Sequence, residues 1–130
     1  MKKQPKFFEI NKLFKKASED EIILTKHLND KEVSDSIWGF HAQQAVEKIL
    51  KAVLTFYEVE FPKTHDLTAL AEYFQSSNIV LPFLIDELET LTPYAVTMRY
   101  DDEIETEIDR QGVYRFIISI RSWAEKIIQN

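Results

Sequence analysis

Residues 34–57, SDSIWGFHAQQAVEKILKAVLTFY, decide the fold of this chain. At 100° per residue their apolar side chains gather on one face that covers roughly half of the helix surface. Ser34 is suited to cap the first turn, because its hydroxyl can accept a hydrogen bond from an N–H group without a helical partner. A face this broad predicts a central helix that packs against several neighbours. The apolar face contains Trp38, Ala42, Ala45, Val46, Ile49, Ala52, Val53 and Phe56.

The polar side of this helix carries two groups of side chains. One group is the pair Gln43 and Glu47, which lie one turn apart. Two interpretations of this pair are open: a solvated pair on the helix surface, or a partly buried pair at a contact with another chain. The second group is a ridge of His41, Gln44, Lys48, Lys51 and Thr55.

The composition indicates one globular domain that spans residues 1–130. Hydrophobic residues make up 45% of the chain and charged residues 29%, and the two glycines and four prolines favour long helices. No cysteine is present, which excludes disulfides and thiol chemistry. No apolar run approaches the roughly 18 residues of a membrane span. Residues 1–6 have the character of a flexible basic tail and not of a signal peptide, so a cytoplasmic protein is expected.

Four further helical segments are expected around the central one. The first covers about residues 8–28, where Glu21 falls on the apolar face, either at its edge or paired with a buried group. The next begins at a Thr64 cap, with His65 at its first position. Another begins near Pro82 and should stop or kink at Pro93, and the last runs from about 108 to 128. The expected fold is an all-α, up-down bundle of four to five helices.

Few residue patterns in this chain fit known binding chemistry. Two isolated glycines cannot form a phosphate loop, and the histidines lack zinc-site spacing. The acidic run DDEIETEID (101–109) has no EF-hand spacing, so no metal and no cofactor is expected. The net charge of −6 argues against a broad nucleic-acid surface, although a local basic cleft stays possible. His65 is either a structural hydrogen-bonding residue or a catalytic one.

Three motifs in order resemble the HEPN family. They are HAQQAVEKILKA (41–52), THDL (64–67) and RY (Arg99 and Tyr100) before the last helix. The resemblance implies a helical bundle that forms homodimers. It also implies a place among prokaryotic toxin–antitoxin pairs, in which many members are metal-independent endoribonucleases and the antitoxin is a minimal nucleotidyltransferase.

The catalytic signature of that family is an arginine followed four to six residues later by a histidine. Histidine would move the 2′-hydroxyl proton while arginine stabilises charge on the phosphate. Arg99 matches the arginine, but Ile104, Glu105 and Thr106 occupy the histidine positions. The resemblance therefore predicts a HEPN protein that binds a partner, with a nucleotide as a further ligand. Its expected phosphate-binding residues are Arg99, Tyr100, Lys48, Lys51 and His41.

An alternative interpretation keeps the ribonuclease activity. Arg99 would still hold phosphate, and His65, His41 or Glu105 would replace the missing histidine. RNA would then be the substrate.

A homodimer is expected, with its two-fold axis near Arg99 and Tyr100. Trp38, Trp123 and nine phenylalanines supply more large apolar surface than a small bundle readily buries. The alternative is a monomer that buries all of them.

Overall fold

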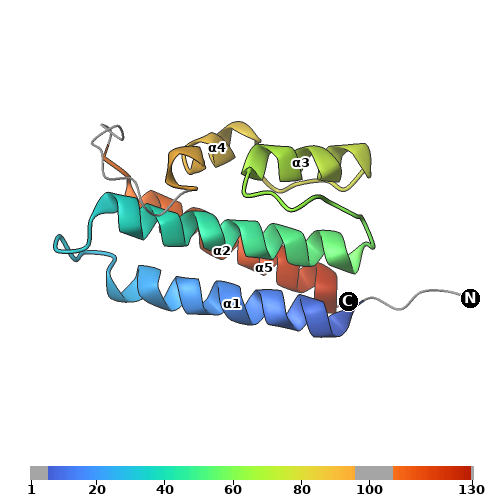
Figure 1. Cartoon of the computed structure of the whole chain (residues 1–130), viewed down its shortest axis with the longest axis horizontal. Coiled ribbons are helices and arrows are strands. Elements are labelled where there is room, and N and C mark those ends of the chain that lie inside the picture. The colour runs from blue at the N-terminus through green and yellow to red at the C-terminus, as the bar shows by residue number, and fades with distance from the viewer. Residues whose placement is uncertain (1–5, 96–106, 130) are drawn as a thin grey trace, which may run out of the picture.

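Helix α2 (Asp35–Phe56) lies at the centre of the chain. The computed structural model describes residues 6–95 and 107–129, and in this part of the chain α2 contacts α1, α3, α5 and the 3₁₀ helix η1 (Figure 1). The Ile37 N–H donates to the Ser34 hydroxyl at 3.2 Å, which confirms the predicted cap. Trp38, Val46 and Ile49 have no exposed surface. The prediction of a central helix with several neighbours is therefore confirmed.

Helices α1 (Phe7–Lys26) and α5 (Arg110–Gln129) complete a layer of long helices with α2. In Figure 1, α1 runs opposite to α2, and α5 runs parallel to α2 behind it. Both helices begin and end within two residues of the predicted limits, which is the usual uncertainty of helix ends. Their buried positions repeat at helical spacing because only one face of each helix meets the core. These positions are Ile10, Ala17 and Leu24 in α1, and Ile117, Ile120 and Ala124 in α5.

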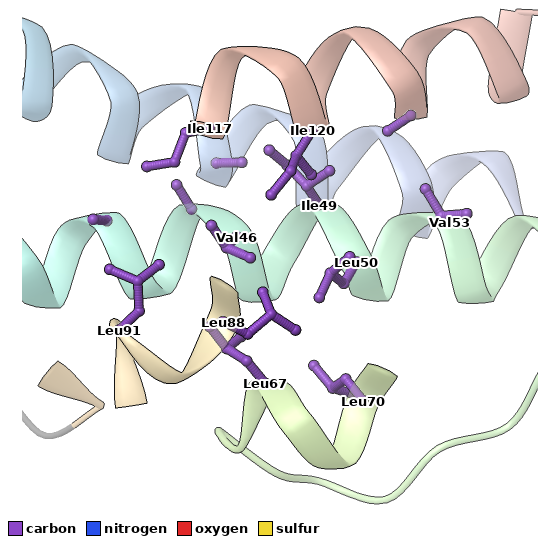
Figure 2. Packing of buried hydrophobic residues seen from close by; sticks show 14 of the residues in the cluster. Val46, Ile49, Leu50, Val53, Leu67, Leu70, Leu88, Leu91, Ile117 and Ile120 are labelled. Carbon is purple, nitrogen blue, oxygen red and sulfur yellow. The ribbon is translucent and has the colours of Figure 1, made fainter. Parts of the chain in front are cut away.

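A second layer covers the side of α2 opposite α1. It consists of α3 (Leu67–Ser76), α4 (Asp86–Glu89) and η1 (Thr92–Tyr94). Figure 2 shows that α5 and the second layer contact α2 from different sides. Ile117 and Ile120 approach from α5, while the second layer supplies Leu67, Leu70, Leu88 and Leu91. The all-α bundle is thus built around one helix that is buried on two sides.

The predicted helix that begins near Pro82 is wrong over most of its length. Helix α4 has only four residues, and residues 82–85 are not helical. From residue 79 to 85 half-buried and exposed positions alternate, which is the period of an extended chain. Every second apolar side chain packs on the core, and this tertiary packing outweighs the local preference for helix. Helix α4 ends at Glu89, four residues before the stop or kink expected at Pro93, and the 3₁₀ helix η1 carries this proline in its first turn.

The start of α3 also differs from the prediction. Asp66, and not Thr64, is the cap, because its carboxylate accepts from the N–H groups of Thr68 and Ala69 at 3.0 and 3.2 Å. The Thr64 hydroxyl accepts from the Asp66 N–H at 3.0 Å, which places Thr64 and His65 in the turn before the helix. His65 is therefore a loop residue.

Both glycines lie in helices and accommodate a neighbouring side chain. A Cβ atom at Gly39 would overlap the ring of Tyr94, so the glycine lets η1 approach the α2 backbone. Burial there raises the pKa of the Tyr94 phenol, and the nearby carboxylate of Asp35 adds to the effect. Gly112 lies in the first turn of α5, where its N–H donates to the Asp109 carboxylate at 3.1 Å.

None of the helices in the described ranges combines the length and apolar character of a membrane span.

Candidate functional site

Two carboxylates are buried beside the polar side of α2. Asp20 of α1 is 6% exposed and Glu47 of α2 is 4% exposed, and with Gln43 they are the buried polar residues of the described ranges. Burial of a carboxylate is unfavourable by several kcal/mol unless hydrogen bonds and opposite charge compensate it. Each of the two carboxylates is bound by one histidine and one lysine.

Glu47 lies at the centre of the first cluster. Its Oε1 contacts the Nδ1 of His65 at 2.9 Å and accepts from the Gln43 amide at 3.2 Å, while its Oε2 accepts from Lys51 at 3.0 Å. The Gln43 amide also donates to the backbone carbonyl of His65 at 2.7 Å. These contacts join α2 to the turn before α3, so the first two motifs of the sequence meet in one hydrogen-bonded cluster.

This geometry excludes one of the two interpretations of Gln43 and Glu47 and leaves the other as a prediction. The pair forms, but it is buried, so a solvated surface pair is wrong. Both residues are buried within the single chain, where Lys51 and His65 pair with Glu47, and no second chain is needed for this burial. A contact of these two residues with a partner stays a prediction. Periodicity could not indicate the burial, because the covering residue His65 lies 18 positions away.

The second cluster surrounds Asp20, which the sequence did not single out. Its Oδ1 contacts His41 Nδ1 at 2.9 Å, and its Oδ2 accepts from Lys48 at 2.6 Å. Asp20 lies between Ala17 and Leu24 at helical spacing, and this position was the signal in the sequence for its burial. In the predicted basic ridge, His41, Lys48 and Lys51 therefore each bind a carboxylate of their own chain, which compensates their charge.

The neighbouring Glu21 is paired, which was one of the two interpretations of its position on the apolar face of α1. Its carboxylate accepts from Arg121 Nε of α5 at 2.8 Å. Arg121 also donates to Ser18 and lies over the ring of Phe14. The pair fixes α5 against α1.

The third histidine follows the same pattern at the α1–α2 connection. His27 is half-buried, and its Nδ1 contacts Asp30 at 2.9 Å. This hydrogen bond is the main cause that lowers the pKa of Asp30. All three histidines thus have Nδ1 on a carboxylate, but they differ in exposure. The side chain of His65 is 69% exposed, against 37% for His27 and 24% for His41.

Arg110, at the start of α5, was not predicted to matter and binds the α1–α2 connection. Its guanidinium donates to the backbone carbonyls of His27, Asp30 and Val33, at 2.7, 3.1 and 2.6 Å. It also donates to the carboxylate of Asp35 at 2.9–3.0 Å. One side chain therefore donates hydrogen bonds to several backbone carbonyls of the connection. The spacing of residue types in the sequence cannot indicate such contacts.

Three predicted site residues, Arg99, Tyr100 and Glu105, lie outside the described residues. Among residues 6–95 and 107–129 no group of three potential ligands could hold a metal ion. The chemically suited group in these ranges is the dyad of His65 and Glu47. The carboxylate fixes the imidazole through Nδ1, and the side chain is 69% exposed, an arrangement that suits proton transfer with solvent or a substrate.

Comparison with protein families gives a match over most of this chain. The model described as HEPN domain matches residues 10–127, which covers both clusters and all described helices except their outermost residues. Neither the comparison with curated proteins nor that with solved structures found a match.

Proposed function

The chain belongs to the HEPN family, and we propose that it acts by binding a protein partner and not by cleaving RNA. The observation that carries this proposal is the order of two residue types. All three histidines precede all four arginines, so an arginine followed by a histidine at four to six residues occurs nowhere in the chain. The acid–base residue of the ribonuclease signature is therefore missing.

The histidine environments support the same proposal. Two of the three imidazoles, those of His27 and His41, bind carboxylates at partly buried positions on or beside α1 and α2. Lys48 and Lys51 pair with Asp20 and Glu47, which reduces the positive charge available to a phosphate chain. These residues stabilise the bundle, and the net charge of −6 opposes nucleic-acid binding.

The partner that we propose is a minimal nucleotidyltransferase, as in the toxin–antitoxin pairs of this family. The chain would act as a cytoplasmic homodimer, with Arg99 and Tyr100 near the two-fold axis and a nucleotide as a further ligand. The aromatic content and the family membership support the dimer.

Co-expression with the product of the adjacent gene tests this function. The expected result is a complex that survives size-exclusion chromatography, together with an absence of RNA cleavage by the purified chain. The melting temperature should rise with nucleotide concentration. Failure to form a complex, with no shift by any nucleotide, would contradict the proposal.

A second function is favoured by the geometry of His65. Its Nδ1 is held by the buried carboxylate of Glu47 while most of the ring is exposed, so it could serve as the acid–base group of an endoribonuclease together with Arg99. The purified chain should then cleave single-stranded RNA in EDTA. The variants Arg99→Ala and His65→Ala should each lose this cleavage, whereas His27→Ala, a matched control, should retain it. Cleavage that survives His65→Ala excludes this mechanism.

A further inference from the structure

The segment between α3 and α4 places apolar side chains in solvent. Its alternating positions have the period of an extended chain with one face on the core. In such a segment the outward positions are ordinarily polar. Here all three outward residues are apolar, and we call Val80, Pro82 and Leu84 the outer stripe. The inward residues are Ile79, Leu81, Phe83 and Ile85, which are half-buried against the core.

The exposure of the outer stripe is large. Val80 and Leu84 are 84% and 73% exposed, and among the large apolar residues of the described ranges only Phe8, at 81%, is comparable. A surface groove of about 460 Å³ is formed by the same segment together with Gln75 and Asp86. Exposed apolar groups beside a groove are typical of interaction sites.

The charged side chains close to the outer stripe in sequence are all acidic. Between Lys63 and Arg99 the sequence contains no lysine or arginine. A layer with this charge attracts a positively charged partner and disfavours an acidic one. The acidic residues of this layer are Asp66, Glu72, Asp86, Glu87 and Glu89.

The chain itself contains a segment of the complementary chemistry. Residues 1–8, MKKQPKFF, carry three lysines and two phenylalanines and no acidic residue. We call them the N-terminal segment. Phe7 and Phe8 begin α1 and are 46% and 81% exposed. The most exposed apolar groups of the described chain therefore lie in two segments of opposite charge.

We propose that the outer stripe binds the N-terminal segment of a second copy of this chain. Phe8 of that copy would cover Val80 and Leu84, and its lysines would face the carboxylates of Asp86 and Glu87. A second copy is required because Phe8 and Val80 both stay exposed within one chain. In addition, α1 and α3 lie on opposite sides of α2 (Figure 1). This contact is independent of the nucleotidyltransferase and of the contact proposed near Arg99.

Titration calorimetry with a synthetic peptide of residues 1–9 tests the proposal on the full chain. We expect a dissociation constant of about 10–100 μM that weakens as salt is raised from about 0.05 to 0.5 M. The double variant Val80→Ser/Leu84→Ser should bind the peptide at least tenfold more weakly. Because both side chains are largely exposed, this variant should keep its circular dichroism spectrum. Ile118→Ser on α5, where the side chain is 47% exposed, is the matched control and should bind normally.

Three outcomes would overturn the proposal. The first is no binding at about 1 mM peptide, beyond the expected range. The second is equal affinity for the double variant and the parent chain. The third is equal affinity for a scrambled peptide of the same composition, because the site would then accept any basic apolar segment.

Discussion

Replacing Glu47 with glutamine tests whether the buried cluster stabilises the bundle. The substitution keeps the shape of the side chain, removes its charge and turns one of its two oxygen positions into a donor. That donor would face Lys51 or His65, which are donors to the carboxylate in the parent chain. The side chain of Lys51 is only 15% exposed, so its ammonium would lose its counterion in a largely dry position.

The magnitude follows from the burial of the partners. Removal of one partner from a fully buried ion pair reduces the free energy of unfolding by about 3–5 kcal/mol. Water can reach His65, which is 69% exposed, and part of Lys51, so solvent offsets some of the loss. We therefore expect Glu47→Gln to lower the free energy of unfolding by about 2–3 kcal/mol.

Urea unfolding followed by circular dichroism at neutral pH measures this change. Glu60→Gln, in an exposed position of the loop after α2, is the matched control and should change the stability by less than about 0.5 kcal/mol. Adding Lys51→Met should recover part of the loss, since it removes the uncompensated ammonium. A loss below about 1 kcal/mol for Glu47→Gln, or no recovery in the double variant, would refute the reasoning.

Three further predictions concern other parts of the bundle. Arg110→Ala should lower the free energy of unfolding by about 2–4 kcal/mol, because partly buried carbonyls lose their donor; a loss under about 0.5 kcal/mol in urea unfolding would contradict this. Gly39→Ala should lower the melting temperature, with a loss of about 1–3 kcal/mol, because the added methyl group overlaps the Tyr94 ring; an unchanged melting temperature argues against close packing there. The hydrogen bond from His27 lowers the pKa of Asp30, so the ionised carboxylate of Asp30 stabilises the fold at pH values above its ordinary pKa of 3.8. This contribution is lost as the pH falls through the lowered pKa of the folded chain. Asp30→Asn should therefore be less stable than the parent at pH about 5 and equally stable in strong acid, and a difference that persists in acid would count against this pairing.

The sequence predicted the parts of the fold that local patterns determine. The limits of the central helix follow from the Ser34 cap and from helical periodicity, and both are properties of neighbouring residues. The non-helical path of residues 79–85 was missed. The run is apolar throughout, so its pattern fits a helix as well as alternating burial.

The candidate site was predicted less completely, because its contacts join residues far apart in sequence. Gln43, Glu47 and His65 were all singled out, but their meeting depends on the path of the loop between α2 and α3. Asp20 was passed over, although its position on the apolar face of α1 required a buried partner. Arg110 binds mainly backbone carbonyls, whose positions no residue type reveals.

The surroundings of Trp38 give this chain a built-in optical reporter. Its indole has no exposed surface, donates from Nε1 to the Leu24 carbonyl at 3.1 Å, and lies 5.5 Å from the guanidinium of Arg110. Trp123, the other indole, is half-buried and close to Phe74. Acrylamide should therefore quench the emission of Trp123 first, and blue-shifted emission that resists quenching reports on Trp38. Any ligand or partner that loosens the connection between α1 and α2 would become visible in this protected emission, without a label.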